Sequence, residues 1–196
     1  RVAIGDAITV SPGERLSYRE AFERDTGLDP HTADAADFAD AARRHGIHVP
    51  EDMRNHHDAA IWRDLLLTHI IEPRLGRGQL TLVYDYPASQ ASLARIQPGV
   101  PPLAARFEAY LDGIELANGF HELADSDEQR TRFERQLHSR SAHKLPPVPL
   151  DEHLLAALSA GLPDCAGVAL GFDRLVMLAL GATRIEEVLA FPLERA

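Results

Sequence analysis

The chain has a single cysteine, Cys165, and no apolar run that approaches the length of a membrane span. One cysteine excludes a disulfide within the chain and fits a reducing compartment. A membrane-spanning helix needs about 20 consecutive apolar residues, and no charged-then-apolar leader opens the sequence. These absences predict a cytoplasmic protein with no membrane partner.

Positive charge is also scarce. The 20 Lys and Arg residues face 30 Asp and Glu residues, which leaves a formal net charge of −10. That balance disfavours a broad nucleic-acid or anionic-membrane footprint, although it leaves room for a local basic patch. Hydrophobic residues make up 45% of the chain, a value typical of a globular domain with a sizeable core.

Several common site motifs are missing as well. The sequence contains neither a glycine-rich P-loop nor a dinucleotide fingerprint. His45, His48, His56 and His57 fall close together but lack cysteine partners and regular ligand spacing, which disfavours a zinc site. Cys165 has no basic neighbour in the sequence to activate it, so we expect an inert thiol.

The segment 16–75 is predicted to be mainly helical. Ser17 followed three residues later by Glu20 is typical of a capping box that opens a helix. Apolar residues at helical spacing predict three helices, over about 17–22, 32–44 and 53–71. Residues 1–15, which include a Pro-Gly pair, are predicted to be a connector.

The segment 79–196 changes to strand-like patterns. Asp112-Gly113 stands between two such runs and predicts a β-hairpin with a type I′ turn. The other expected elements are strands over 79–86 and 164–172 and helices over 125–142, 151–160 and 174–180. Helices followed by an antiparallel sheet with helices laid on it indicate an α+β fold in one domain, 1–196.

Two glutamates of the hairpin are candidate metal ligands. If Leu111 pairs with Ile114, Glu108 opposes Ala117, and Glu108 and Glu115 lie on one face of the sheet. Two carboxylates that close repel each other unless a cation neutralises them. Mg²⁺ commonly takes one or two carboxylates plus phosphate oxygens. The alternative is a pair of solvated glutamates on an exposed face.

Asn118, Phe120 and Glu122 form a second candidate group. On a straight strand they line the face opposite to that of Glu115, and a bulge at Gly119 is expected to turn both sets toward one cleft. A carboxylate beside an amide and an aromatic ring suits an ammonium group. The alternative is a structural sheet face.

The segment GVALGFDR predicts a strand of small residues that delivers Arg174 to the start of a helix. Gly167, Ala169 and Gly171 leave room for a flat group close to the backbone. A guanidinium beside a helix N-terminus suits a phosphate. In the alternative interpretation the small residues only permit tight packing, and Arg174 pairs with Asp173.

Together these segments resemble the class II lysyl-tRNA synthetases. RFEAYLDGIELANGFHEL, the helix DEQRTRF and GVALGFDRLVMLALG are similar to the C-terminal half of that family's catalytic domain, and the last segment is similar to its motif 3. YDYPASQASLARI and GLPDCAGVALGFDRLVMLALGA are more similar to a paralogous branch, the elongation factor P–(R)-β-lysine ligases. The resemblance runs from about Leu16 to the C-terminus and implies a class II antiparallel sheet flanked by helices.

The resemblance also implies roles for the matching residues. Arg174 and Glu115 would carry the catalysis. The ATP-binding set would be Glu115, Leu116 through its backbone, Gly171 and Arg174, with Mg²⁺ on Glu108 and Glu115. The amino acid would contact Asn118, Phe120, Glu122 and Ala169, with Glu122 on its ammonium group. The carboxylate of the amino acid would attack ATP to give an acyl-adenylate, and a lysine of elongation factor P would accept the acyl group.

Two departures from the synthetase pattern bear on this interpretation. Motif 3 of lysyl-tRNA synthetases usually has three alternating glycines, and Ala169 replaces the middle one. One added methyl group at a pocket wall is worth about 1–3 kcal/mol of discrimination, and alanine here is typical of the ligase branch. Motif 1, which would form a homodimer interface, and motif 2 lie upstream of Arg1 in the family. We therefore expect the chain to be an inactive piece of a longer protein, incomplete at its N-terminal side.

Three hypotheses remain open at this point. The first is the β-lysine ligase, which uses ATP and Mg²⁺ and modifies elongation factor P. The second is a lysyl-tRNA synthetase, against which Ala169 and the acidic balance speak, as they speak against tRNA as a partner. The third is a non-catalytic paralogue that uses the fold only for binding.

Overall fold

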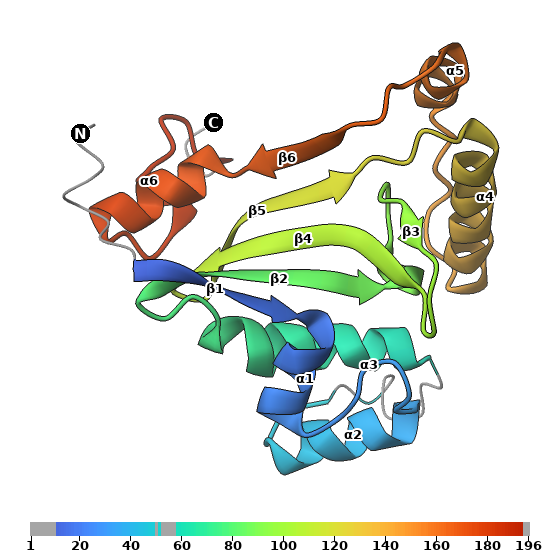
Figure 1. Cartoon of the computed structure of the whole chain (residues 1–196). Coiled ribbons are helices and arrows are strands. Elements are labelled where there is room, and N and C mark those ends of the chain that lie inside the picture. Colours follow the sequence, from blue (N-terminus) through green and yellow to red (C-terminus); the bar gives the residue numbers. More distant parts are fainter. Residues whose placement is uncertain (1–10, 50, 52–57, 194–196) are drawn as a thin grey trace.

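A mixed six-stranded sheet forms the centre of the molecule (Figure 1). The computed structural model describes residues 11–49, 51 and 58–193. The strand order is β1-β2-β4-β5-β6, with β3 paired to β4. β1 runs parallel to β2, and the other neighbours are antiparallel. The strands are β1 Ser11–Ser17, β2 Gln79–Pro87, β3 Ile96–Gln97, β4 Leu103–Leu111, β5 Ile114–His121 and β6 Ala166–Leu170.

Three helices pack under the β1–β2 side of the sheet (Figure 1). They are α1 Tyr18–Thr26, α2 Ala35–Arg44 and α3 Ala59–Leu66, and α3 continues through a π turn, Leu67–Ile71, and a 3₁₀ turn, Glu72–Arg74. Their apolar sides bury Tyr18, Phe22, Phe38 and Trp62 in one core with strand residues Val83, Tyr86 and Tyr110. This core therefore rests on the face of the sheet that also carries Glu108, because Glu108 and Tyr110 lie two residues apart on β4 and point to the same side. We call it the Glu108 face.

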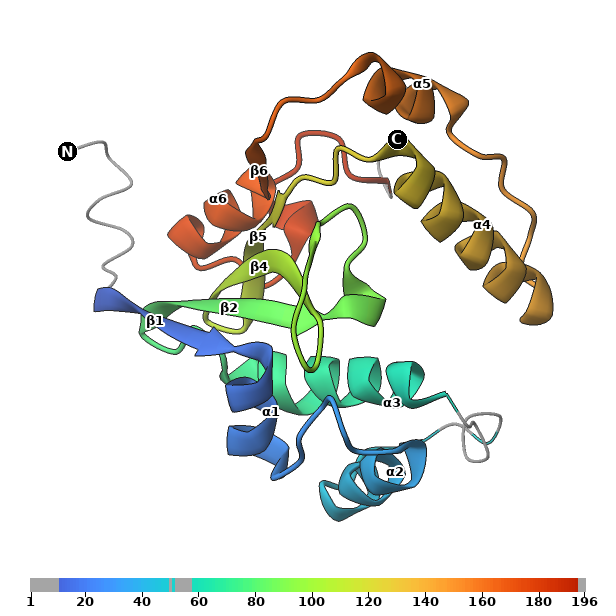
Figure 2. The same ribbon diagram turned by 45° about the vertical axis from the view of Figure 1, so that its right-hand side comes forward.

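The remaining helices lie at the two ends of the sheet. α6, Phe172–Leu180, follows β6 at one end, whereas α4, Ser126–Ala142, and α5, Glu152–Ala160, lie together at the other (Figures 1 and 2). Short 3₁₀ turns occupy Ala88–Gln90 and Ile185–Glu187. None of the described helices is both long enough and apolar enough to cross a membrane.

The predicted hairpin is confirmed at its turn. Asp112 has φ 51° and Gly113 has φ 79°, the positive values that a type I′ turn requires at both positions. The turn is tied to the loop before β2, since Asp112 N–H donates to the Gly76 carbonyl and Gly113 N–H to the Leu75 carbonyl, each at 2.8 Å. A side chain at Gly76 would clash with the Leu111 backbone, so this close approach requires glycine.

Other local predictions were confirmed in part. The Ser17–Glu20 capping box is present at the start of α1. The expected connector 1–15 is wrong for its last residues, because residues from Ser11 onward pair with β2 as strand β1. Residues 1–10 lie outside the described residues, as does the 53–57 part of the expected helix 53–71; the rest of that helix is α3 and its π turn.

Candidate functional site

A bulge in β5 brings the two predicted groups of site residues onto one face. Tyr110 pairs with Glu115 as predicted, but Ala109 pairs with Ala117, which leaves Leu116 as an extra residue. Glu108 therefore opposes Asn118 and not Ala117, so the predicted Glu108–Ala117 pairing and the predicted bulge at Gly119 are both wrong. The bulge at Leu116 produces the expected result by other means, because it reverses the alternation of the strand.

The neighbouring strand extends the same face. Asn118 pairs with Ala169 and Phe120 pairs with Gly167 on β6. Directly opposed residues of an antiparallel pair point to the same side. The Glu108 face thus gathers six of the predicted residues: Glu108, Glu115, Asn118, Phe120, Gly167 and Ala169.

Glu108 is buried, and both of its carboxylate oxygens accept hydrogen bonds. Its Oε2 accepts hydrogen bonds from the hydroxyls of Tyr86 at 2.6 Å and Tyr110 at 2.5 Å, and Arg106 forms an ion pair with its Oε1. Burial, and then the charge of Glu108, raises the pKa of the Tyr110 phenol, so this group remains a donor at neutral pH. The arrangement fixes the carboxylate of Glu108 in place.

Glu115 is more accessible and connects the sheet to α6. Arg174 Nη1 donates to the Glu115 carbonyl at 2.7 Å and to its Oε2 at 3.2 Å, while Asn118 Nδ2 donates to Oε1 at 3.2 Å. The side chains of Glu115 and Arg174 are 31% and 46% exposed. Arg174 therefore pairs with Glu115, and the pairing with Asp173 expected in the packing-only alternative is wrong.

A third carboxylate, that of Glu72 in the 3₁₀ turn Glu72–Arg74, lies near Glu108 and Glu115. The Tyr110 hydroxyl lies 3.3 Å from Glu72 Oε1. Burial raises the pKa of Glu72, and the negative charges of Glu108 and Glu115 raise it further. The site thus concentrates negative charge, which Arg106 and Arg174 offset only in part.

The Glu122 carboxylate lies directly over Gly167. A β-carbon on Gly167 would stand 2.5 Å from Glu122 Oε1, so only glycine at this position leaves the carboxylate its place. Among the described residues Glu122 has no ion pair or side-chain hydrogen bond, although its backbone is held by Cys165 and Arg95. An unpaired carboxylate of this kind is available to a cation.

Gly171 and Leu116 meet at the bulge. The Gly171 N–H donates to the Leu116 carbonyl at 2.8 Å, and Gly171 is the N-cap of α6, where no side chain caps the free N–H groups of the first turn. A side chain on Gly171 would press against Arg174 Cδ at 3.3 Å.

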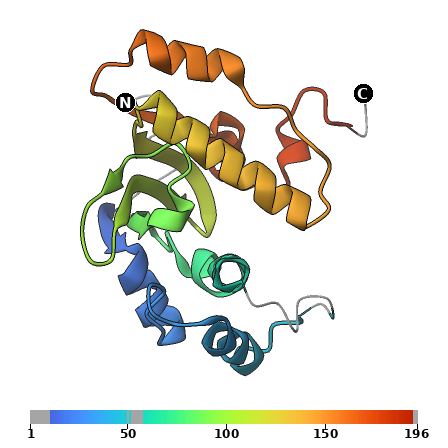
Figure 3. The same ribbon diagram turned by 90° about the vertical axis from the view of Figure 1, so that its right-hand side faces the viewer.

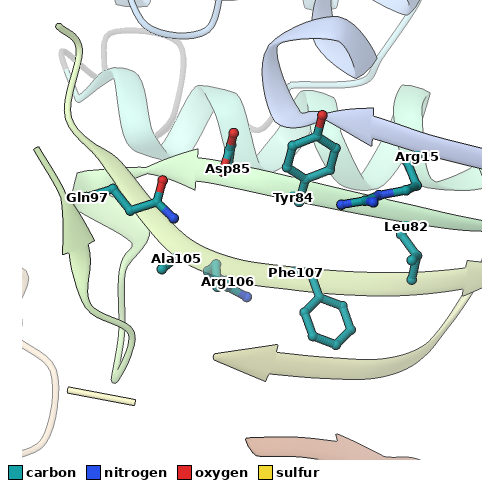
Figure 4. A pocket seen from close by; sticks show the side chains of 8 residues that line it. All are labelled: Arg15, Leu82, Tyr84, Asp85, Gln97, Ala105, Arg106 and Phe107. Atoms are coloured by element: carbon teal, nitrogen blue, oxygen red, sulfur yellow. The ribbon is translucent and has the colours of Figure 1, made fainter. Parts of the chain in front are cut away.

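Beside these residues a cavity of about 660 Å³ runs along the Glu108 face. Glu72, Glu108 and Glu115 line it at one end, and Gln129, Arg135 and Ser139 of α4 line it at the other. The segment 88–93 lines it as well. A second cavity of about 390 Å³ lies around β1, β2 and β4 (Figure 4) and contains none of the predicted site residues. Its lining is Arg15, Leu82, Tyr84, Asp85, Gln97, Ala105, Arg106 and Phe107.

The donor set fits a divalent cation only with help from a ligand. The described residues contain no group of three or more His, Cys, Asp or Glu side chains placed to hold a metal ion. Each oxygen of Glu115 accepts one hydrogen bond and keeps a second lone pair. Two carboxylates with phosphate oxygens are a usual Mg²⁺ environment. Two of the four clustered histidines, His56 and His57, lie outside the described residues.

Sequence reasoning missed four residues of the site, namely Arg106, Tyr86, Tyr110 and Glu72. Arg106 and Tyr110 flank Glu108 at spacing two, so strand alternation was a usable signal for both. Arg106 also lies over the ring of Tyr86 at 4.4 Å and over that of Phe120 at 5.5 Å. Tyr86 and Glu72 come from separate elements, and only the tertiary fold brings them near.

Comparison with known proteins adds a family to this geometry. A family model described as "tRNA synthetases class II (D, K and N)" matches residues 7–195. Elongation factor P–(R)-β-lysine ligases from Klebsiella pneumoniae subsp. pneumoniae and from Salmonella arizonae are 51% and 50% identical over 185 residues. A ligase of the same name from Salmonella dublin is 49% identical over 185 residues. Each match covers 94% of this chain and 56% of the relative, so the chain spans about half the length of the relatives it matches.

Proposed function

Because the chain belongs to the class II tRNA synthetases of the D, K and N group, we propose that it builds the ATP and amino-acid site of an enzyme that activates (R)-β-lysine. The carboxylate of the amino acid attacks the α-phosphorus of ATP, which releases pyrophosphate and leaves an acyl-adenylate. A lysine amine of elongation factor P then takes the acyl group and releases AMP. The observation that carries this proposal is the unpaired carboxylate of Glu122, held over Gly167 on the same sheet face as Ala169.

The amino acid occupies the β5–β6 part of the Glu108 face. Glu122 accepts the ammonium group, since an isolated carboxylate gains most from a cation in a partly desolvated place. The Asn118 amide and the Phe120 ring border the same space, because they lie two residues apart on one face of β5. They pair with Ala169 and Gly167 of β6. The small residues of β6 keep the face open for the substrate backbone.

The nucleotide occupies the α6 end. Arg174 already stands beside Glu115, and its remaining guanidinium nitrogens are free to meet phosphate oxygens in the bidentate manner that arginine favours. The uncapped first turn of α6 after Gly171 adds N–H groups and a favourable dipole for an anion. The backbone of Leu116, whose carbonyl accepts a hydrogen bond from Gly171, borders the place of the adenine ring.

Magnesium fits between these two parts. Glu115 and Glu108 would hold it together with phosphate oxygens, and the ion would neutralise charge on the triphosphate. The three carboxylates Glu72, Glu108 and Glu115 supply an excess of negative charge that favours a cation here. Tyr86, Tyr110 and Arg106 keep Glu108 in a fixed orientation.

No covalent protein nucleophile is required by this scheme. The chain's residues act by placing the two reactants together and by matching charge: Glu122 holds the amine, and Arg174 holds phosphate. Such positioning and preorganised electrostatics are sufficient to supply large rate accelerations. Cys165, the one cysteine, has no part in it.

Ala169 favours the β-amino acid over lysine itself. Its methyl group stands beside Asn118 on the face proposed for the amino acid. A single methyl group at a pocket wall discriminates by about 1–3 kcal/mol. The same residue weighs against the second hypothesis, a lysyl-tRNA synthetase.

We also propose that additional chain completes the site along β6. In the described part of the protein β6 is the last strand of the sheet, and Val168 and Leu170 are 64% and 55% exposed. An exposed apolar edge strand usually pairs or is covered. The relatives are nearly twice as long as the matched segment, which leaves enough chain for this purpose.

ATP–pyrophosphate exchange by the protein as its gene encodes it tests the proposal. We expect exchange with (R)-β-lysine that exceeds exchange with α-lysine. A clear preference for α-lysine, with transfer to tRNA, would establish the synthetase in place of the ligase. Absence of exchange with both amino acids while each still binds would favour the non-catalytic paralogue.

A further inference from the structure

The C-terminal half of α4 and the loop after it are basic in an otherwise acidic chain. Residues 135–150 contain no Asp or Glu, although the chain has 30 of them. The same stretch holds three of its 20 Lys and Arg residues, Arg135, Arg140 and Lys144, together with His138 and His143. We call residues 135–150 the basic segment.

The basic segment is exposed, and two of its three cationic side chains have no ion-pair or hydrogen-bond partner among the described residues. Arg135 and Lys144 are exposed, and neither forms an ion pair or a side-chain hydrogen bond with any residue in the described ranges. Arg130 and Arg132, which precede the segment on α4, do pair, with Glu152 and Glu128. Leu145 and Val148 are 49% and 48% exposed beside Lys144. A mixture of free cations and accessible apolar groups is typical of a protein-binding surface.

The segment also borders the cavity of the candidate site. Arg135, Gln136 and Ser139 line the same cavity that reaches Glu108 and Glu115. Figure 3 looks onto this end of the molecule and shows α4 and α5 above the sheet end, with α1 to α3 below. A group that enters the cavity on its α4 side contacts these residues.

We propose that the basic segment docks an acidic surface of the protein that accepts the acyl group. The inference rests on the proposed function and adds to it the place and the charge of the acceptor's contact. The acceptor must insert a lysine side chain toward the acyl-adenylate, and its surface around that lysine meets Arg135, Lys144 and the apolar pair. Oppositely charged surfaces raise the association rate and fix the orientation of docking.

Charge argues for protein over nucleic acid as the occupant. A chain with a net charge of −10 repels a polyanion, and three fixed cations neutralise few phosphates. The basic segment has no Phe, Tyr or Trp side chain on which a base would stack. Leu145 and Val148 have no use against a phosphate backbone but suit a protein surface.

Charge reversal in the protein as its gene encodes it tests the docking surface. Arg135→Glu with Lys144→Glu is compared with Arg43→Glu with Arg44→Glu, two exposed residues of α2 whose reversal changes the net charge by the same amount. Arg140 is left unchanged because its guanidinium holds the Pro146 carbonyl. Elongation factor P is the acceptor probe. Its Kd is measured directly, and its KM is measured in acyl transfer.

We expect the Arg135/Lys144 variant to weaken Kd and raise KM for the acceptor about tenfold. The change should shrink toward onefold near 1 M salt, where charges are screened within about 3 Å. ATP–pyrophosphate exchange and the α2 control should stay within twofold of the parent protein.

The outcomes separate this proposal from the one it rests on. Unchanged acceptor Kd and KM with normal exchange would overturn the docking surface and leave the proposed function standing. An equal loss in the α2 control would also overturn it, because net charge alone would then be responsible. Absent exchange in the parent protein would overturn the function, while the Kd measurement would still decide the surface. Tighter binding of tRNA than of the acceptor, lost on reversal, would assign the segment to nucleic acid.

Discussion

Arg174 at the start of α6 donates from one guanidinium nitrogen to both the main-chain carbonyl and the carboxylate of Glu115 on β5. The contact joins residues 59 positions apart in the chain and anchors α6 on the sheet beside the Leu116 bulge. Both hydrogen bonds use Nη1, and the other guanidinium nitrogens form none with the described residues. One residue therefore positions the helix and presents donors to a phosphate.

Arg174→Lys is expected to lower ATP–pyrophosphate exchange by about 10²–10³-fold in the protein as encoded. Loss of one preorganised donor to a developing charge has an effect of this size, and an ammonium cannot reproduce the planar fork of donors. Arg184→Lys is the matched control, because Arg184 is 70% exposed and forms an ion pair with Glu186 two residues further on. Near-normal exchange in Arg174→Lys would remove Arg174 from the catalytic role.

The Leu116 bulge also marks the limit of prediction from this sequence. Period-two alternation and the Asp112-Gly113 turn gave the hairpin and its first pairs, because both depend on neighbouring residues. The bulge depends on how β5 meets α6 and β6, since the carbonyl of the extra residue Leu116 accepts a hydrogen bond from the Gly171 N–H. No local pattern places that contact, so the bulge was expected at Gly119.

Gly119 has a different reason to be glycine. A side chain there would collide with the Phe107 ring and the Gly167 carbonyl, so the residue permits close packing on the opposite face. Tyr86 and Glu72 were missed for a similar reason, because they reach Glu108 and Tyr110 only when distant elements pack together. The resemblance supplied residues within its motifs and could not supply these partners.

Gly167→Ala is expected to raise the KM for the amino acid about 10- to 100-fold with little change in the KM for ATP. The added methyl group would displace the Glu122 carboxylate, and misplacing one methyl group in a pocket has an effect of this order. Val168→Ala is the control, since its 64% exposed side chain points to the other face. Steady-state kinetics with each substrate varied in turn makes the measurement, and an equal rise in both KM values would contradict a role confined to the amino acid.

Ala169→Gly is expected to shift the ratio of kcat/KM for α-lysine over (R)-β-lysine upward by about tenfold. Removing the methyl group beside Asn118 relieves the pocket wall that we hold responsible for discrimination. Exchange assays with both amino acids give the ratio. The same substitution at exposed Ala166 serves as the control on β6. An unchanged ratio would place the discrimination elsewhere.

Glu72→Gln is expected to raise the melting temperature at pH 7.5 by roughly 2–4 °C, about 1 kcal/mol for a domain of this size. Burial first, and then Glu108 and Glu115, raise the pKa of Glu72 above its ordinary value near 4.5. Stability therefore falls as the pH rises from the unfolded-state pKa through the higher folded-state pKa. The gain should vanish at pH 4, where the carboxyl is mostly protonated in both states.

The measurement for Glu72 is thermal unfolding of the purified chain in EDTA, so that no divalent ion offsets the charge. Glu186→Gln provides the contrast. Hydrogen bonds from its own backbone amide and then from Arg184 lower the pKa of Glu186, so loss of its charge should give no gain at pH 7.5. A pH-independent gain in Glu72→Gln would show that packing, and not charge, accounts for the effect.

The purified 196-residue chain alone is expected to show no ATP–pyrophosphate exchange, while the protein as encoded shows it. Within the described residues the nucleotide end is built from one side only: Arg174 is exposed, and β6 presents Val168 and Leu170 at an open edge. Catalysis of acyl-adenylate formation needs donors around the α-phosphate and exclusion of water, both of which depend on an enclosed site. Adding back the remaining part of the encoded protein as a separate polypeptide should restore exchange if it covers β6. Turnover by the chain alone would refute the expectation and show that the residues described here suffice for adenylate formation.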